Sequence, residues 1–171
     1  MRFIGALTLD ASAYEDVEAD RRSGMQAVLV VMSATAAGGI ASVGLGASPL
    51  GFVAGAVMAL GGWLMWVSMI LTVGTTTLAQ PQTRSSGQEL LRTLGFAAAP
   101  GVFVAFAAMR AVAPFVFAVV SIWMIATAVL AVRQSLDFRS TPRAIAVCAI
   151  TWVLTIGFVF LIATLFGPTV S

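Results

Sequence analysis

The side chains with the most scope for chemistry are a few charged residues that stand between long apolar runs. Glu89 and Arg92 are three residues apart, and Arg139 and Arg143 are four apart in a second polar stretch. Arginine binds carboxylates and phosphates through a planar fork of N–H donors. On a helix, Glu89 and Arg92 can pair with each other or with the opposite stretch. These four residues are candidate contacts for a protein partner or for lipid headgroups; the alternative is that they set topology and neutralise one another.

Other constellations that carry chemistry are missing. The chain has no histidine and a single cysteine, Cys148, which excludes a histidine-based triad, a histidine metal site and an intrachain disulfide. No glycine-rich phosphate loop occurs, and no acid or base lies at the centre of an apolar run, where ion-coupled transporters usually need one. We therefore expect no enzyme activity, no cofactor and no metal ion. The basic residues are scattered arginines with a net charge of +2, so we expect no nucleic-acid partner.

The elements that must position these residues are transmembrane helices. Of 171 residues, 60% are hydrophobic and 9% are charged, against roughly 25% charged in soluble domains. Crossing the bilayer takes roughly 20 apolar residues, and the third run is long enough only if its helix begins near Gln88. We predict an all-α polytopic bundle of five transmembrane helices in one domain at 25–167, followed by a short external tail at 168–171. The predicted spans are 25–45, 51–79, 88–109, 111–132 and 144–166.

The polar segment 1–24 precedes the first span. Its apolar opening is too short for a signal-peptide core, so we expect the N-terminus to be kept. Asp10 or Ser12 can cap a short helix, because Ser12 and Glu15 have capping-box spacing. The segment is either a solvated or interfacial cap or an acidic docking surface for a soluble partner.

The arginines also predict the orientation. Short cytoplasmic loops collect arginine, and a cytoplasmic N-terminus with an external C-terminus places every arginine except Arg110 on the cytoplasmic side. The acids fall on that side as well. Any soluble partner is therefore expected in the cytoplasm.

Glycine and proline give two predictions inside the membrane. Gly51 and Gly55 are four residues apart in a stretch rich in small residues, which favours either a tight intrachain hairpin or a homodimer face. Pro100 lacks an N–H, so the third span should kink there, with Gly95 and Gly101 easing the bend. Most such kinks only serve packing, although broken spans sometimes form ion or substrate sites.

One stretch carries a family resemblance. The loop Gly87-Gln88-Glu89-Leu90-Leu91-Arg92-Thr93-Leu94-Gly95-Phe96 precedes Pro100, Trp123 lies in the fourth span, and Arg143-Ala144 opens the fifth. With the polar N-terminal segment, this layout resembles the YIP (Ypt-interacting protein) domain family, and most closely its short prokaryotic members. The resemblance implies a multi-pass protein of the bacterial cytoplasmic (inner) membrane. Eukaryotic members bind prenylated Rab GTPases, but their Asp-Leu-Tyr-Gly-Pro motif is absent here.

Two functions remain open from the sequence. The first is a non-enzymatic membrane adaptor or organiser that acts through its cytoplasmic face, with the lipid bilayer, a cytoplasmic protein or a second copy of the chain as partner. The second is a small permease or transporter subunit with an unknown substrate. Its path would use the break at Pro100 and the polar residues Ser68, Thr72, Ser121 and Thr127.

Overall fold

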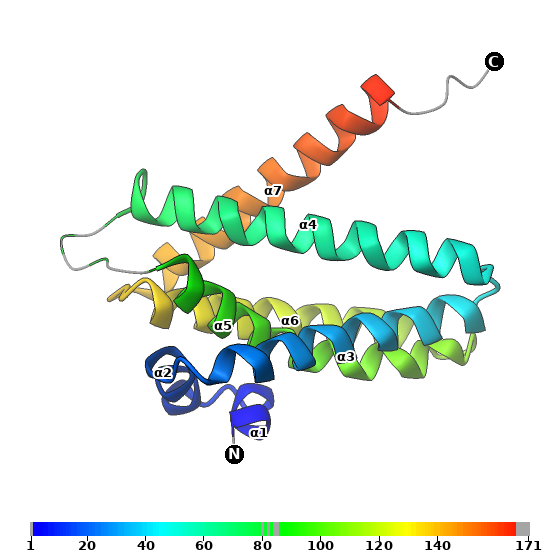
Figure 1. The fold of residues 1–171 in the computed structure, drawn as a ribbon, viewed down its shortest axis with the longest axis horizontal. Helices are drawn as coiled ribbons and strands as arrows, with labels where there is room; N and C mark the ends of the chain where they lie inside the picture. Colours follow the sequence, from blue (N-terminus) through cyan, green and yellow to red (C-terminus); the bar gives the residue numbers. More distant parts are fainter. Residues whose placement is uncertain (1, 80, 82, 84–85, 167–171) are drawn as a thin grey trace.

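The computed structural model describes residues 2–79, 81, 83 and 86–166, and this part of the chain consists of helices without any strand (Figure 1). Arg84 and the predicted tail at 168–171 lie outside the described residues, as do the side chains at 54–55, 58–59, 159, 163 and 165–166. The elements are α1 (Arg2–Leu7), α2 (Ala11–Ala19), α3 (Ser23–Gly44), α4 (Pro49–Thr75), α5 (Gly87–Ala97), the 3₁₀ helix η1 (Ala99–Ala108), α6 (Ala113–Ser135) and α7 (Thr141–Phe166).

Helices in the described residues are long and apolar enough to cross a membrane at four places. These are Ser23–Gly44, Gly87–Ala108, Ala113–Ser135 and Thr141–Ile162. The chain therefore has the character of a membrane-embedded helical protein. α4 extends over 27 residues, of which the apolar segment Leu60–Thr75 is fully described. Helices α3 and α7 begin two to three residues before the first and fifth predicted spans, and α4 ends at Thr75, before the predicted end of the second span.

Local side-chain chemistry explains where several helices begin. Asp10 is the N-cap of α2, and its carboxylate accepts hydrogen bonds from the Ser12 backbone N–H at 3.0 Å and from the Ser12 hydroxyl at 2.7 Å. Ser48 caps α4 by accepting from the Gly51 N–H at 3.1 Å, directly before Pro49. Of the two caps that the sequence allowed for α2, the structure thus selects Asp10.

The third apolar run forms two helices of different type. α5 ends at Ala97, and η1 continues for ten residues, whereas 3₁₀ helices rarely exceed three or four. Pro100 has no N–H, and the Gly101 N–H donates to Ala98, so the carbonyl of Ala97 loses its helical partners. The Thr127 hydroxyl on α6 donates to that carbonyl at 2.7 Å. The carbonyl that the helix break leaves without a backbone partner is thereby hydrogen-bonded inside the protein.

α3 lies parallel to α5 and η1, with their backbones in close approach. At three glycines along this seam, an added Cβ would lie 2.6 to 2.9 Å from an alanine of the facing helix, which is closer than side chains tolerate. Small residues allow such contact between membrane helices. The pairs are Gly95 with Ala27, Gly101 with Ala34, and Gly44 with Ala108.

Gly51, one of the two glycines chosen from sequence for helix packing, takes no part in this seam. Gly51 is exposed near the start of α4, and the nearest atom to a Cβ built there is the hydroxyl oxygen of its own cap, Ser48, at 3.2 Å. Gly55 lies in α4, but its packing is outside the described residues. A homodimer face at these glycines stays a prediction.

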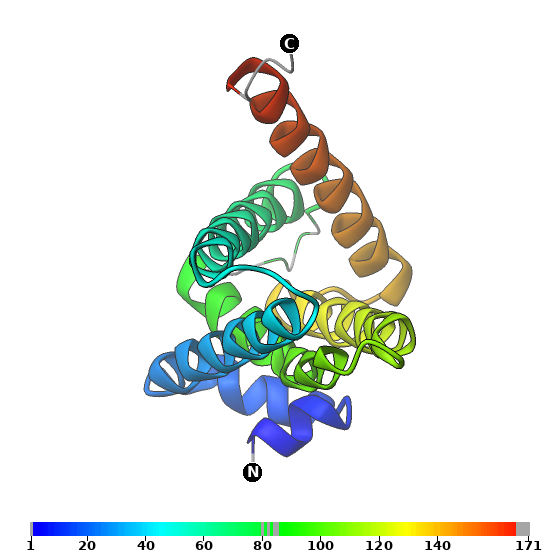
Figure 2. The ribbon, with the colours of Figure 1, turned by 90° about the vertical axis from the view of Figure 1, so that its right-hand side faces the viewer.

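The helices form three layers (Figure 2). α3, α5 with η1, and α6 make the middle layer, α1 and α2 cover one side of it, and α4 and α7 lie on the other. The larger core cluster joins α2 to the middle layer through fully buried side chains. Among the largest are Tyr14, Leu90, Leu94, Phe96 and Leu136.

Candidate functional site

Most charged side chains gather at one end of the bundle, which we call the polar end: residues 10–24, 86–92 and 133–143. It is formed by α2, the starts of α3 and α5, and the turn between α6 and α7. The Gln134 side chain donates to Glu15 at 3.1 Å, which joins the α6 part of this end to α2. The four charged residues chosen from sequence all lie here.

Arg92 is the most buried charged residue of the polar end, with 7% of its surface exposed. Its Nη2 donates to the backbone carbonyl of Glu18 at 2.7 Å, which ties α5 to the end of α2. Its stem passes 3.9 Å from the position of a Cβ at Gly24. Its Nε is buried and has no hydrogen-bond partner among the described residues. A desolvated cation with so few partners is costly unless an anion compensates it.

Glu89 has a local role. Its carboxylate accepts a hydrogen bond from the Ser86 N–H at 2.7 Å, and its own N–H donates to the Ser86 hydroxyl at 3.2 Å. This capping box starts α5. In the described part of the chain no ion pair joins Glu89 to Arg92; the ion pairs found there connect Arg2 with Asp16 and Asp20.

Arg139 and Arg143 lie on the other side of the polar end. Arg139 is exposed in the turn before α7, and Arg143 is half-buried in the first turn of α7. Arg143 Nη1 donates to the carbonyl of Leu78 at 3.3 Å, so it holds the segment that follows α4 against the start of α7. Arg139 is thus the most accessible of the four predicted contact residues.

Glu18 is a functional candidate that the sequence did not single out. Burial, followed by the carboxylates of Asp137 and Glu89, raises the pKa of Glu18 to about 7, and the Arg92 charge opposes this shift. The charge of the polar end therefore changes near neutral pH. Only the fold brings residues 18, 89 and 137 together, so no local pattern pointed to this carboxylate.

The N-terminal helices are fixed to the bundle. The indole N–H of Trp123, on α6, donates to the carbonyl of Leu7 at 2.9 Å, and Tyr14 and Val17 are each 1% exposed. Arg2 forms ion pairs with Asp16 at 2.7 Å and with Asp20 at 2.9 Å, and these pairs connect α1 to α2 and to the residue that follows it. This segment is a packed part of the fold, which gives the polar end a defined shape.

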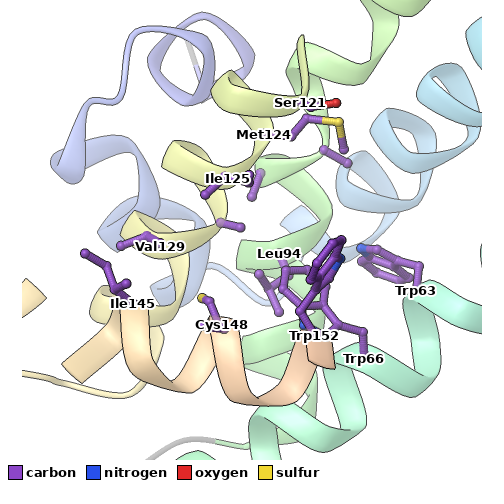
Figure 3. A pocket seen from close by; sticks show the side chains of 14 residues that line it. Trp63, Trp66, Leu94, Ser121, Met124, Ile125, Val129, Ile145, Cys148 and Trp152 are labelled. Carbon is purple, nitrogen blue, oxygen red and sulfur yellow. The ribbon is translucent and has the colours of Figure 1, made fainter. Parts of the chain in front are cut away.

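Among the grooves between the described helices, one lies outside the polar end and another reaches it. The first, the tryptophan groove, has a volume of about 520 Å³ and lies between α4, α5, α6 and α7; Figure 3 shows Trp63, Trp66 and Trp152 beside Cys148 and Leu94 in its wall. The second, which we call the arginine groove, also measures about 520 Å³. It lies between α3, α4 and α5, and its lining includes Arg21, Gln88 and Arg92.

Polar residues of the predicted transport path do not converge. Ser68 and Thr72 face outward on α4 and donate to carbonyls of their own helix. Ser121 is exposed on α6, and Thr127 is buried with its hydroxyl on Ala97. The predicted kink residues Gly95 and Pro100 lie on either side of the change in helix type, and Gly95 packs on Ala27.

The described residues also contain no group of three or more acids, histidines or cysteines that could hold a metal ion. The chain matches no protein-family model, no curated protein and no solved structure.

Proposed function

We propose that this chain is a five-span integral membrane protein whose N-terminus and polar end face the cytoplasm. The arginine distribution supports this orientation, because every arginine except Arg110 then lies inside. Arg110 also has a structural reason to lie at the opposite end. Its side chain donates to the carbonyls of Gly44 at 3.3 Å and Leu45 at 3.2 Å, and so closes the end of α3. In this proposal α4, the second span in chain order, is added to the four helices named above and brings the number of spans to five.

Cysteine labelling tests this orientation. In a Cys148→Ala background, Ser140→Cys should react with an impermeant maleimide only after the membrane is opened, because Ser140 lies in the exposed turn at the polar end. Ala47→Cys, in the exposed turn at the opposite end, should react in intact cells. The reverse pattern would invert the topology, and labelling of both from outside would refute the odd number of spans between them.

We infer that the protein is a non-enzymatic membrane organiser or adaptor that works through its polar end. The observation that carries this proposal is the fixed packing of α1 and α2 on the bundle, with Arg92 held on the Glu18 carbonyl and Trp123 on the Leu7 carbonyl. This packing gives the polar end a defined surface for a partner or for lipid. The resemblance to the YIP family is part of the same proposal. Transport draws less support, since Thr127 occupies the carbonyl that the helix break releases.

Recruitment in native membranes tests the function. Arg139→Glu reverses an exposed charge at the polar end, and we expect it to lower the recovery of a stoichiometric cytoplasmic partner at least several-fold after crosslinking and size separation. Ala47→Glu, at the opposite end, is the matched control and should leave recovery unchanged. Equal recovery with both variants would count against an adaptor, and substrate-dependent flux in proteoliposomes would favour the transporter.

A further inference from the structure

We propose that the arginine groove binds one anionic phospholipid, with its phosphate between Arg92 and Arg21 and one acyl chain between α3 and α4. This proposal deepens the function given above and rests on the same membrane placement. It gives the polar end a chemically defined ligand.

The groove is polar at one end and apolar along its length. Arg21 stands two residues before α3, and Gln88 and Arg92 lie in the first two turns of α5, so all three line it at the polar end. Away from that end the wall is apolar and includes Val28 and Val31 of α3 and Leu60 and Trp63 of α4. Its volume of about 520 Å³ lies within the roughly 300–1,000 Å³ typical of ligand sites.

Charge favours a phosphate at the mouth. Both charged residues that line the groove are arginines, and no carboxylate lines it. Arg92 is buried, its guanidinium makes one hydrogen bond among the described residues, to the Glu18 carbonyl, and its buried Nε has no hydrogen-bond partner there. Arginine binds phosphate through paired, charge-assisted hydrogen bonds.

The acids near Arg92 do not pair with its positive charge. Glu18 on α2, Glu89 on α5 and Asp137 in the α6–α7 turn lie near enough to influence one another electrostatically, but none forms an ion pair with Arg92 in the described part of the chain. Glu89 is engaged in its capping box. A phosphate approaching from the groove side would therefore meet the guanidinium without a competing carboxylate in the lining.

The apolar wall distinguishes a lipid from a soluble anion. A free phosphate would use the mouth alone, whereas a phospholipid would also cover the side chains between α3 and α4. An anionic headgroup fits better than a zwitterionic one, because a choline or ethanolamine cation would sit beside two arginines with no carboxylate lining the site.

The test uses the purified full-length chain in detergent, titrated with dioleoyl phosphatidylglycerol and separately with dioleoyl phosphatidylcholine, with adducts counted by native mass spectrometry. We expect one phosphatidylglycerol to bind at least about tenfold more tightly than phosphatidylcholine. Arg92→Gln and Arg21→Gln should each weaken that binding by about tenfold. Arg22→Gln is the matched control, since Arg22 is an exposed neighbour that does not line the groove.

A second pair of variants tests the acyl-chain position without touching an arginine. Val28→Trp fills the groove and should weaken phosphatidylglycerol binding, whereas Val43→Trp, at a similarly exposed site elsewhere on α3, should not. Competition by millimolar glycerol 1-phosphate equal to that by the lipid would identify a soluble anion and overturn the proposal. Equal binding of both lipids, or wild-type binding by both arginine variants, would overturn it too. If only the lipid result fails while partner recruitment still depends on Arg139, the proposed function stands without this ligand.

Discussion

Gly95→Leu should separate α3 from α5 and lower the free energy of unfolding by about 3 kcal/mol or more. A Cβ at Gly95 would already lie 2.8 Å from the Ala27 Cβ and 3.4 Å from the Ala27 Cα and carbonyl oxygen, so the obstacle is partly backbone and has little freedom to move. Leucine adds three more carbons to that contact. The midpoint of unfolding in mixed detergent micelles, followed by circular dichroism, measures the loss.

A control and a rescue make this result specific. Gly61→Leu is the matched control, since nothing lies within 4 Å of a Cβ at Gly61 on the exposed face of α4, and it should leave stability unchanged or slightly higher. Gly95→Ala should be destabilising alone and largely restored by Ala27→Gly, which removes the clashing methyl group. Equal stability of the two leucine variants would show that the seam is not tightly packed.

Tyr14→Ala should release the N-terminal helices and lower stability by about 3 kcal/mol. Tyr14 is 1% exposed within the core cluster that joins α2 to the bundle, and alanine would leave a large cavity there. Limited trypsin digestion gives the local measurement, because Arg21 and Arg22 lie directly after α2. We expect cleavage at these arginines to become several times faster.

Tyr14→Phe is the comparison for this effect. The hydroxyl of Tyr14 donates to the Ala6 carbonyl at 3.4 Å, which is long for such a bond, so its removal should change stability far less than loss of the ring. If the alanine variant digests no faster than the phenylalanine variant, α2 is not held by this side chain, and the polar end loses the rigidity on which its proposed function depends.

The sequence predicts the helices better than the contacts between them. Apolar run length predicted helices at the four places that are long and apolar enough to cross a membrane, because crossing hydrocarbon imposes a minimum length. Of the two cap candidates Asp10 and Ser12, the structure bears out Asp10. The helical class and the membrane character follow from these local rules. The helices begin and end a few residues away from the predicted span boundaries, because caps and turns, rather than hydropathy, decide where a helix begins and ends.

The site was harder to predict, because it depends on contacts between distant segments. Arg92 and Glu18 are 74 positions apart, and nothing near Arg92 shows that its guanidinium lies on a backbone carbonyl of α2. Spacing suggested a pair of Glu89 with Arg92, but the cap at Ser86 takes the carboxylate instead. Likewise, the small residues of α3 pack on α5 and η1, and only the three-dimensional pairing reveals Ala27 as the partner of Gly95.

The 3₁₀ helix also bears on how the chain matches the thickness of its bilayer. A 3₁₀ helix rises about 2.0 Å per residue, against 1.5 Å in an α-helix, so the ten residues of η1 extend roughly 20 Å instead of roughly 15 Å. An apolar run that is short by residue count thereby gains reach without added residues. An α-helix of the same ten residues would be shorter by roughly 5 Å, so the change in helix type gives this run a length that its residue count alone would not provide.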